Sequence, residues 1–309
     1  MPAKRKPVAT PELSRLTVLA AGDEKQFADH ALELIASGER LAREAALAAL
    51  VERPVARTRE RLRDLFFELH ADGLKRDQGA IQRVDIVRIL RALGDIRDAD
   101  IALSATDAFE KLKAFDDDLS WRLRAEGLMM LAETSADLFP YVAVEHLDDN
   151  TGIDGAPASI AFQLLAGLGH FVPLYQWLMS SEHLPRAEIF ELLARGAPRD
   201  VVSRYVASTI GVALRREDEV MLTTLAESIV NLEMEDSYAA LGDVMSAKIS
   251  DELYGYLAVL LAGTNRAPLL AILDWQLHRG RRPKLVEQAL RVRTTREQQV
   301  ILDRWQKGE

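Results

Sequence analysis

The sequence contains no cysteine, and aromatic residues make up only 6% of its 309 residues. A chain without cysteine has no disulfide framework, no thiolate nucleophile and no cysteine-ligated zinc or iron–sulfur site. Uninterrupted apolar runs reach about seven residues, whereas a membrane-spanning helix needs roughly 20. The basic N-terminus is not followed by the apolar core of a signal peptide. We therefore expect a soluble, cytoplasmic protein that has no membrane partner.

Motifs of catalysis and cofactor binding are also missing. The six histidines form no HExxH motif and no pair four residues apart, and GxGxxG, GxxxxGK[ST] and GxSxG do not occur. The segment EHLDDNTGIDG carries oxygen ligands suited to a divalent cation, but Ile153 and Ser159 stand where an EF-hand needs glycine and glutamate. The same Asp, Asn and Gly residues also suit a turn between helices. We predict no catalytic residue, no metal site and no cofactor, and so a protein that is not an enzyme.

The chain has no run of alternating β-branched and polar residues bounded by turn dipeptides, and helical periodicity dominates instead. Residues 26–37, for example, place Phe27, Ala31 and Leu34 on one helix face. Thr10 and Pro11 form a typical helix start, and most prolines lie near the ends of periodic segments. The sequence predicts an all-α protein of about 16 to 18 helices, arranged as successive antiparallel pairs.

Comparing the sequence with itself reveals a repeat. Arg43, Arg83 and Arg124 are evenly placed, at an interval of roughly 40 residues. Each is followed by a leucine seven residues later, and three residues after each stand Ala46, Ile86 and Gly127, respectively. The motif LLAGLG marks a fourth copy that has lost its arginine. Helix pairs repeated at this period stack into a solenoid, because one pair cannot bury its own apolar face.

These copies resemble the HEAT repeat of the armadillo-type fold, in which an aspartate stands six residues before the arginine. The best match is DLSWRLRAEGLMMLAET at 118–134, and SGERLAREAALAALVE at 37–52 is second. The resemblance implies that Asp77 with Arg83, and Asp118 with Arg124, form hydrogen bonds between neighbouring repeats. Ser37 replaces the aspartate in the first copy, which weakens or caps the ladder there.

The resemblance implies a right-handed α-α superhelix, and it covers somewhat less than half of the chain. We expect capping helices in residues 1–36 and HEAT-like repeats in residues 37–170. Residues 171–309 show helices without a clean repeat, so they form either degenerate repeats or a C-terminal helical cap. Three tryptophans lie in segments with helical periodicity and are expected in the core: Trp121, Trp177 and Trp275. If they are exposed instead, they would serve as anchors for a binding partner.

Charge is unevenly distributed. The net charge is +1 over residues 1–100, −14 over residues 101–266 and +4 over residues 267–309. There are two interpretations of the acidic residues 101–266. They could attract a partner with a basic surface, or they could simply keep an elongated protein soluble. Two basic clusters, one of five arginines within residues 53–63 and one within residues 278–296, could flank one groove and hold phosphate. The arginines of the first cluster could instead pair with carboxylates four residues away. The phosphate-contacting candidates are Arg57, Arg59, Arg61, Arg281, Arg282 and Lys284.

These patterns favour a non-enzymatic scaffold that binds a protein partner along the concave face formed by the second helix of each pair. The helical phase places these candidates on that face: Arg40, Glu44, Arg88, Arg91, Glu126 and Gln163. We expect that replacing Arg88 and Arg91 together by glutamate weakens binding and leaves the melting temperature nearly unchanged. The alternative is a nucleic-acid-binding solenoid, of the kind seen in HEAT-like DNA glycosylases, that uses the arginine-rich ends. Analogy of fold alone also suggests an accessory role in cofactor attachment, as in HEAT-containing bilin lyases.

Overall fold

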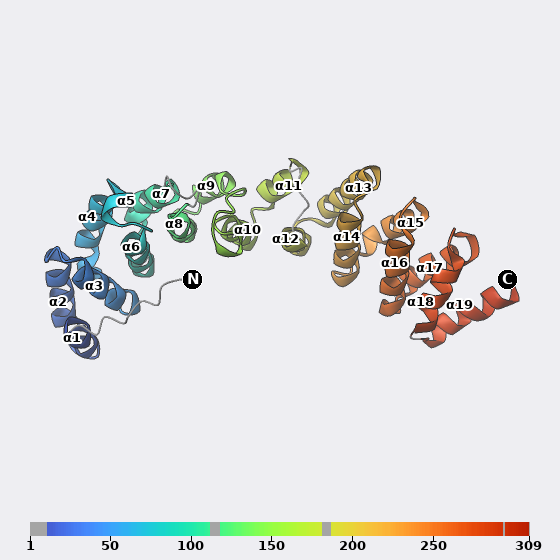
Figure 1. Cartoon of the computed structure of the whole chain (residues 1–309), viewed down its shortest axis with the longest axis horizontal. Coiled ribbons are helices and arrows are strands. Elements are labelled where there is room, and N and C mark those ends of the chain that lie inside the picture. Colours follow the sequence, from blue (N-terminus) through green and yellow to red (C-terminus); the bar gives the residue numbers. More distant parts are fainter. Residues whose placement is uncertain (1–10, 112–117, 181–186, 293, 309) are drawn as a thin grey trace. The chain divides into compact units, whose positions relative to one another are not determined.

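The computed structural model describes residues 11–111, 118–180, 187–292 and 294–308. These residues form nineteen α-helices and four short 3-10 helices, and their only β pairing is an isolated bridge between Lys111 and Asp118 (Figure 1). The predicted all-α class is confirmed. The helix number exceeds the expected range because one of the nineteen is a single turn. Within the described residues, every helix is too short or too polar to cross a membrane. Thr10, the predicted cap of the first helix, lies outside these residues.

The chain divides into two compact units, residues 1–165 and residues 166–309. The expected boundaries at residues 36 and 170 stay predictions. The helices of the first unit are α1 (Pro11–Ala20), α2 (Glu24–Ala36), α3 (Arg40–Glu52), α4 (Arg59–His70), α5 (Gly73–Arg76), α6 (Ile81–Leu93), α7 (Ala99–Thr106), α8 (Trp121–Thr134), α9 (Phe139–Glu145) and α10 (Ala158–Gly167), which extends two residues past the boundary.

In the first unit, helices pack in pairs, and one helix of each pair packs on its equivalent in the next pair. The pairs are α2 with α3, α4 with α6, and α7 with α8, while α3 packs on α6 and α6 packs on α8. The helices α3, α6 and α8 begin at residues 40, 81 and 121, which matches the spacing of the sequence repeat. The helices α7 and α8 come very close at Gly127, where a Cβ would lie 2.9 Å from the carbonyl oxygen of Ala102.

The second unit contains the remaining helices: α11 (Phe171–Ser180), α12 (Ala187–Gly196), α13 (Arg199–Arg216), α14 (Glu219–Asn231), α15 (Tyr238–Ser246), α16 (Asp251–Thr264), α17 (Ala267–Arg279), α18 (Pro283–Val292) and α19 (Arg296–Lys307). Two rows of helices pack side by side. One row is α12, α14, α16 and α18, and the other is α13, α15, α17 and α19.

The first of these rows has a period that the sequence reading missed. The helices α12, α14, α16 and α18 begin at residues 187, 219, 251 and 283, so the interval between successive starts is constant. The same interval separates Leu193, Leu225 and Leu257, all of which are buried in the core. The second unit is therefore a regular array of helix pairs with a shorter repeat than the first.

Candidate interaction surfaces

Asp77 and Arg83 form a completely buried ion pair at the start of α6. The carboxylate of Asp77 accepts hydrogen bonds from the backbone N–H groups of Gln82 and Arg83 at 3.0 Å each, and from the Arg83 Nε at 3.2 Å. The guanidinium of Arg83 also donates to Glu110 at 2.5 and 2.9 Å. Because Glu110 lies beyond α7, this arginine connects its own helix pair to the next one. Burial disfavours the charged form of Arg83 and by itself would lower its pKa. The contacts with Glu110 and Asp77 have the larger combined effect, so the pKa of Arg83 is raised.

Arg124 repeats this arrangement in the following helix pair. It contacts Asp118 within its own repeat, and its Nε donates to Asp149 of the next repeat at 2.7 Å. Burial disfavours the ionised form of Asp149, but contacts with His146, Arg124 and Thr151 outweigh that effect and lower its pKa well below the usual range. The expected contacts of Asp77 with Arg83 and of Asp118 with Arg124 are present, but each lies within one repeat and not between neighbouring repeats. The links between repeats run instead from the two arginines to Glu110 and Asp149.

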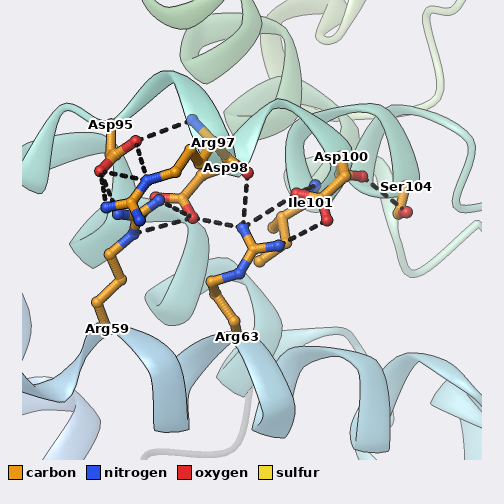
Figure 2. A network of polar contacts seen from close by, with 8 residues as sticks. All are labelled: Arg59, Arg63, Asp95, Arg97, Asp98, Asp100, Ile101 and Ser104. Carbon is orange, nitrogen blue, oxygen red and sulfur yellow. Dashed lines mark hydrogen bonds and ion pairs between the residues drawn. The ribbon is translucent and has the colours of Figure 1, made fainter.

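A second polar network joins α4 to the start of α7 (Figure 2). Arg59 donates to Asp98 at 3.0 and 3.2 Å and also contacts Asp95, while Arg63 donates to Asp98 and Asp100 at 2.6 Å each. The side chain of Asp98 is fully buried. The pKa of Arg63 is raised, mainly by its hydrogen bond with Asp100 and also by its contact with Asp98.

The three N-terminal candidates for phosphate contact, Arg57, Arg59 and Arg61, are each paired with a carboxylate of the protein. Besides Arg59, Arg57 pairs with Asp29 at 3.1 Å and Arg61 pairs with Glu68 at 2.7 Å. The carboxylates that pair with Arg57 and Arg59 come from other helices, not from the i,i+4 neighbours that the sequence suggested.

The C-terminal cluster belongs to the second unit and is more open. Arg282 contacts Asp251, donates to the carbonyl oxygen of Ile249 at 2.6 Å and lies over the ring of Tyr254. Arg281 and Lys284 are exposed to solvent. Of the three C-terminal candidates for phosphate contact, Arg282 is therefore held by a neighbouring helix and the other two point to water.

Three acidic residues recur in the equivalent helices of successive pairs in the first unit. Glu44 of α3, Asp85 of α6 and Glu126 of α8 are equally spaced along the chain, at the interval of the sequence repeat. The carboxylate of Glu126 is buried and accepts hydrogen bonds from Arg88 at 2.6 Å and from Arg91 at 3.0 Å. Three of the predicted face residues thus form one ion-pair cluster between α6 and α8.

The other predicted face residues are more exposed. Arg40 donates to Glu44 at 2.9 Å on the surface of α3, and Gln163 is exposed on α10. Asp85, the middle residue of the acidic row, is half-buried. Burial, with smaller contributions from Asp77, Glu126 and Glu44, raises its pKa to about 6 despite the nearby Arg88.

In the acidic segment at residues 145–155, Glu145, Asp148 and Asp154 are exposed, whereas Asp149 has a structural role. Asp149 is occupied by Arg124 and by the Thr151 hydroxyl, which donates at 2.7 Å. Within the part of the chain that the structure describes, no three His, Asp or Glu side chains are grouped to hold a metal ion.

The expectation that Trp275 lies in the core is wrong. Its side chain is 50% exposed, because α15, which neighbours α17, offers mostly small residues on the facing side. Together the two helices border an open groove of about 380 Å³, whose lining consists of Ala239, Gly242, Asp243, Ser246, Ala271, Ile272 and Trp275. Trp121 and Trp177 are only partly exposed, and the ring of Trp121 lies against Gly152, where a Cβ would come within 2.4 Å of it.

Polar contacts also connect successive helix pairs in the second unit. Glu219, the first residue of α14, accepts hydrogen bonds from the N–H and the hydroxyl of Ser250 at 2.7 Å each. Asp251, the first residue of α16, makes the equivalent contact with Arg282. Each partner stands directly before the next helix of the row, Ser250 before α16 and Arg282 before α18. Sequence reasoning missed these residues because it searched for the Asp–Arg spacing of the first unit.

We compared the chain with protein-family models, with curated proteins and with solved structures, and found no match.

Proposed function

We propose that the protein is a non-enzymatic, protein-binding scaffold built as a HEAT-like α-solenoid with a right-handed superhelix. The observation that carries the proposal is the repeated polar link between helix pairs. Arg83 reaches Glu110 and Arg124 reaches Asp149, each arginine being completely buried. Such links fix each repeat on its neighbour, which is the building principle of repeat proteins. Repeat proteins of this type use extended surfaces to bind other macromolecules.

The charges of the described residues support a protein partner rather than a nucleic acid. A phosphate site needs cations that are available to the ligand. Arg57, Arg59 and Arg61 are each paired with a carboxylate of the protein. The strongly acidic residues 101–266 would repel a phosphate backbone and attract a basic surface. We therefore propose a partner with a basic surface.

Affinity capture with the tagged full-length chain tests the proposal. The tagged protein is incubated with lysate of its source cells, with and without nuclease, and bound material is identified by mass spectrometry. A scaffold retains a discrete protein after nuclease treatment. Recovery that collapses with nuclease would overturn the proposal in favour of nucleic-acid binding, and Arg281 and Lys284 would then be the first residues to replace.

A further inference from the structure

We propose that the groove between α15 and α17 is a docking site for an amphipathic helix of a partner protein, one that places a large aliphatic side chain against Trp275 and a lysine or arginine beside Asp243. This inference rests on the proposed scaffold function and names a surface and a class of partner for it. The groove lies entirely within the second unit, and every residue lining it belongs to the described part of the chain.

The shape of the groove follows from the residues of its two walls. The α15 wall consists of Ala239, Gly242, Asp243 and Ser246, which follow one another at helical spacing. Because these side chains are small, the groove stays open. The other wall is formed by α17, which contributes the half-exposed Trp275. Two neighbouring helices with a furrow between them accept the ridge of a third helix.

Hydrogen bonds join the two helices that form the walls of the groove. Gln276 of α17 is buried, and its amide nitrogen donates to the Ser246 hydroxyl at 2.9 Å and to the carbonyl oxygen of Gly242 at 3.4 Å. The hydroxyl of Tyr254 donates to the amide oxygen of Gln276 at 3.1 Å. Because α15 and α17 are held in register, the groove is formed before a partner binds, and less ordering entropy is lost on binding.

Trp275 supplies the apolar contact. A half-exposed tryptophan next to Ile272 offers a large rigid surface, and tryptophan is among the residues that most often dominate the binding energy of interfaces. The apolar lining matches an aliphatic or aromatic side chain from the partner.

Charge complementarity determines the kind of helix that fits. Asp243 is the one charged residue among those that line the groove, and it is exposed. On the α15 side, residues 217–247 contain eight acidic residues and neither lysine nor arginine, and the α17 wall carries one aspartate, Asp274, and one arginine, Arg279. An acidic helix would be repelled here, and a basic one attracted. The partner is therefore a basic amphipathic helix.

The test uses a fluorescein-labelled peptide, five helical turns or about 18 residues long, with leucine on one helix face and lysine elsewhere. Its binding to the full-length chain is measured by fluorescence anisotropy at physiological ionic strength. The blocking variant is Gly242→Leu. A Cβ at Gly242 meets only the Ile272 side chain at 3.7 Å, which is ordinary contact distance. The leucine side chain then fills the groove, and leucine is a better helix former than glycine, so the variant keeps its fold.

We expect Gly242→Leu and Trp275→Ala each to weaken peptide binding at least tenfold. Gly263→Leu is the matched control, because Gly263 is an exposed helical glycine with open space around its Cβ position; it should bind like the unmodified chain. Asp243→Lys should weaken binding of the lysine peptide and strengthen binding of a leucine–glutamate peptide with the same pattern. Thermal unfolding of each variant verifies that it is folded.

Three outcomes overturn the inference. The first is equal affinity of the unmodified chain and the Gly242→Leu variant for the lysine peptide. The second is equal affinity of the unmodified chain for the lysine and glutamate peptides. The third is self-association in sedimentation velocity that Gly242→Leu abolishes, because the occupant would then be a second copy of the chain.

The experiments can refute the docking-site proposal and the scaffold proposal independently. If the Gly242→Leu variant captures the same nuclease-resistant protein as the unmodified chain, the groove is not the docking site and the scaffold function stands. If peptide binding depends on the groove but no protein survives nuclease treatment in the capture experiment, the scaffold function fails and the groove stands.

Discussion

Arg83 of α6 donates two hydrogen bonds to Glu110, a residue that belongs to the next helix pair. The same guanidinium neutralises Asp77, which has no exposed side-chain surface. One side chain thus stabilises a helix start and fixes the spacing between two repeats. The contact explains why an arginine, with its several donors in one plane, occupies this position.

Replacing Arg83 by methionine should destabilise the first unit by about 3 to 5 kcal/mol, because Asp77 is left buried without its counter-charge. Urea unfolding followed by circular dichroism measures the change. Arg61→Met is the control, since Arg61 and Glu68 are a partly exposed pair that contributes about 1 kcal/mol or less. Equal losses in the two variants would contradict the structural role of Arg83.

Replacing Arg88 and Arg91 together by glutamate should lower the free energy of unfolding by roughly 2 kcal/mol. This is less than the loss of a fully buried ion pair would cost, because both arginines are partly exposed to solvent. Both side chains donate to the buried Glu126, so the variant gathers three carboxylates at one place. The structure thereby revises the expectation from sequence that the melting temperature would hardly change. Arg40→Glu, on the surface of α3, should have a much smaller effect. An unchanged melting temperature in the double variant would show that Glu126 finds other donors.

Asp85→Asn should stabilise the protein at pH 7. Burial is the main reason that the pKa of Asp85 is raised to about 6 in the folded chain, above the value of roughly 3.9 expected when unfolded. The folded state therefore prefers the protonated form, and stability is lost as pH rises through about 6. The gain from asparagine should reach at most about 3 kcal/mol at pH 7 and disappear near pH 4. Urea unfolding of both proteins across this range measures it, and a difference independent of pH would refute the assignment.

Gly127→Ala should destabilise the first unit by about 1 to 3 kcal/mol, although alanine is the better helix former. A Cβ at this position lies 2.9 Å from the carbonyl oxygen of Ala102 and 3.0 Å from the Cβ of Ala105, so α7 and α8 must separate. Gly263→Ala, on the exposed surface of α16, should instead raise stability by up to about 1 kcal/mol. Differential scanning calorimetry distinguishes the two, and a stabilised Gly127→Ala variant would show that the helices separate at little cost.

Helical periodicity in the sequence was sufficient to predict the all-α class, and the resemblance to the HEAT repeat implied the contact of Asp77 with Arg83. The sequence was not sufficient to predict that Glu110 and Asp149 bind these arginines. Both carboxylates belong to another helix pair, and their distance from the arginine along the chain differs between the two repeats. The shorter repeat of the second unit could have been found from Leu193, Leu225 and Leu257, but no Asp–Arg motif accompanies them. The search for the Asp–Arg motif therefore passed over the second unit.

The exposure of Trp275 could not be predicted for a different reason. Helical periodicity shows that a side chain lies on one stripe of its helix, but it does not show how much the neighbouring helix covers. Here the neighbour presents Gly242 and Ser246, so the tryptophan remains accessible. In the same way, Glu126 has the helical phase of a surface residue, but the two arginines of α6 bury it.

The two buried arginine links of the first unit run forward along the chain, and this direction matters while the protein is being made. Arg83 and Arg124 find their second carboxylates 27 and 25 residues later. Each arginine leaves the ribosome before its second carboxylate does, so for a time the arginine lacks that partner. Domains generally form from the N-terminus onward during synthesis. Each of these repeats therefore gains its last ion-pair partner only when part of its successor has emerged.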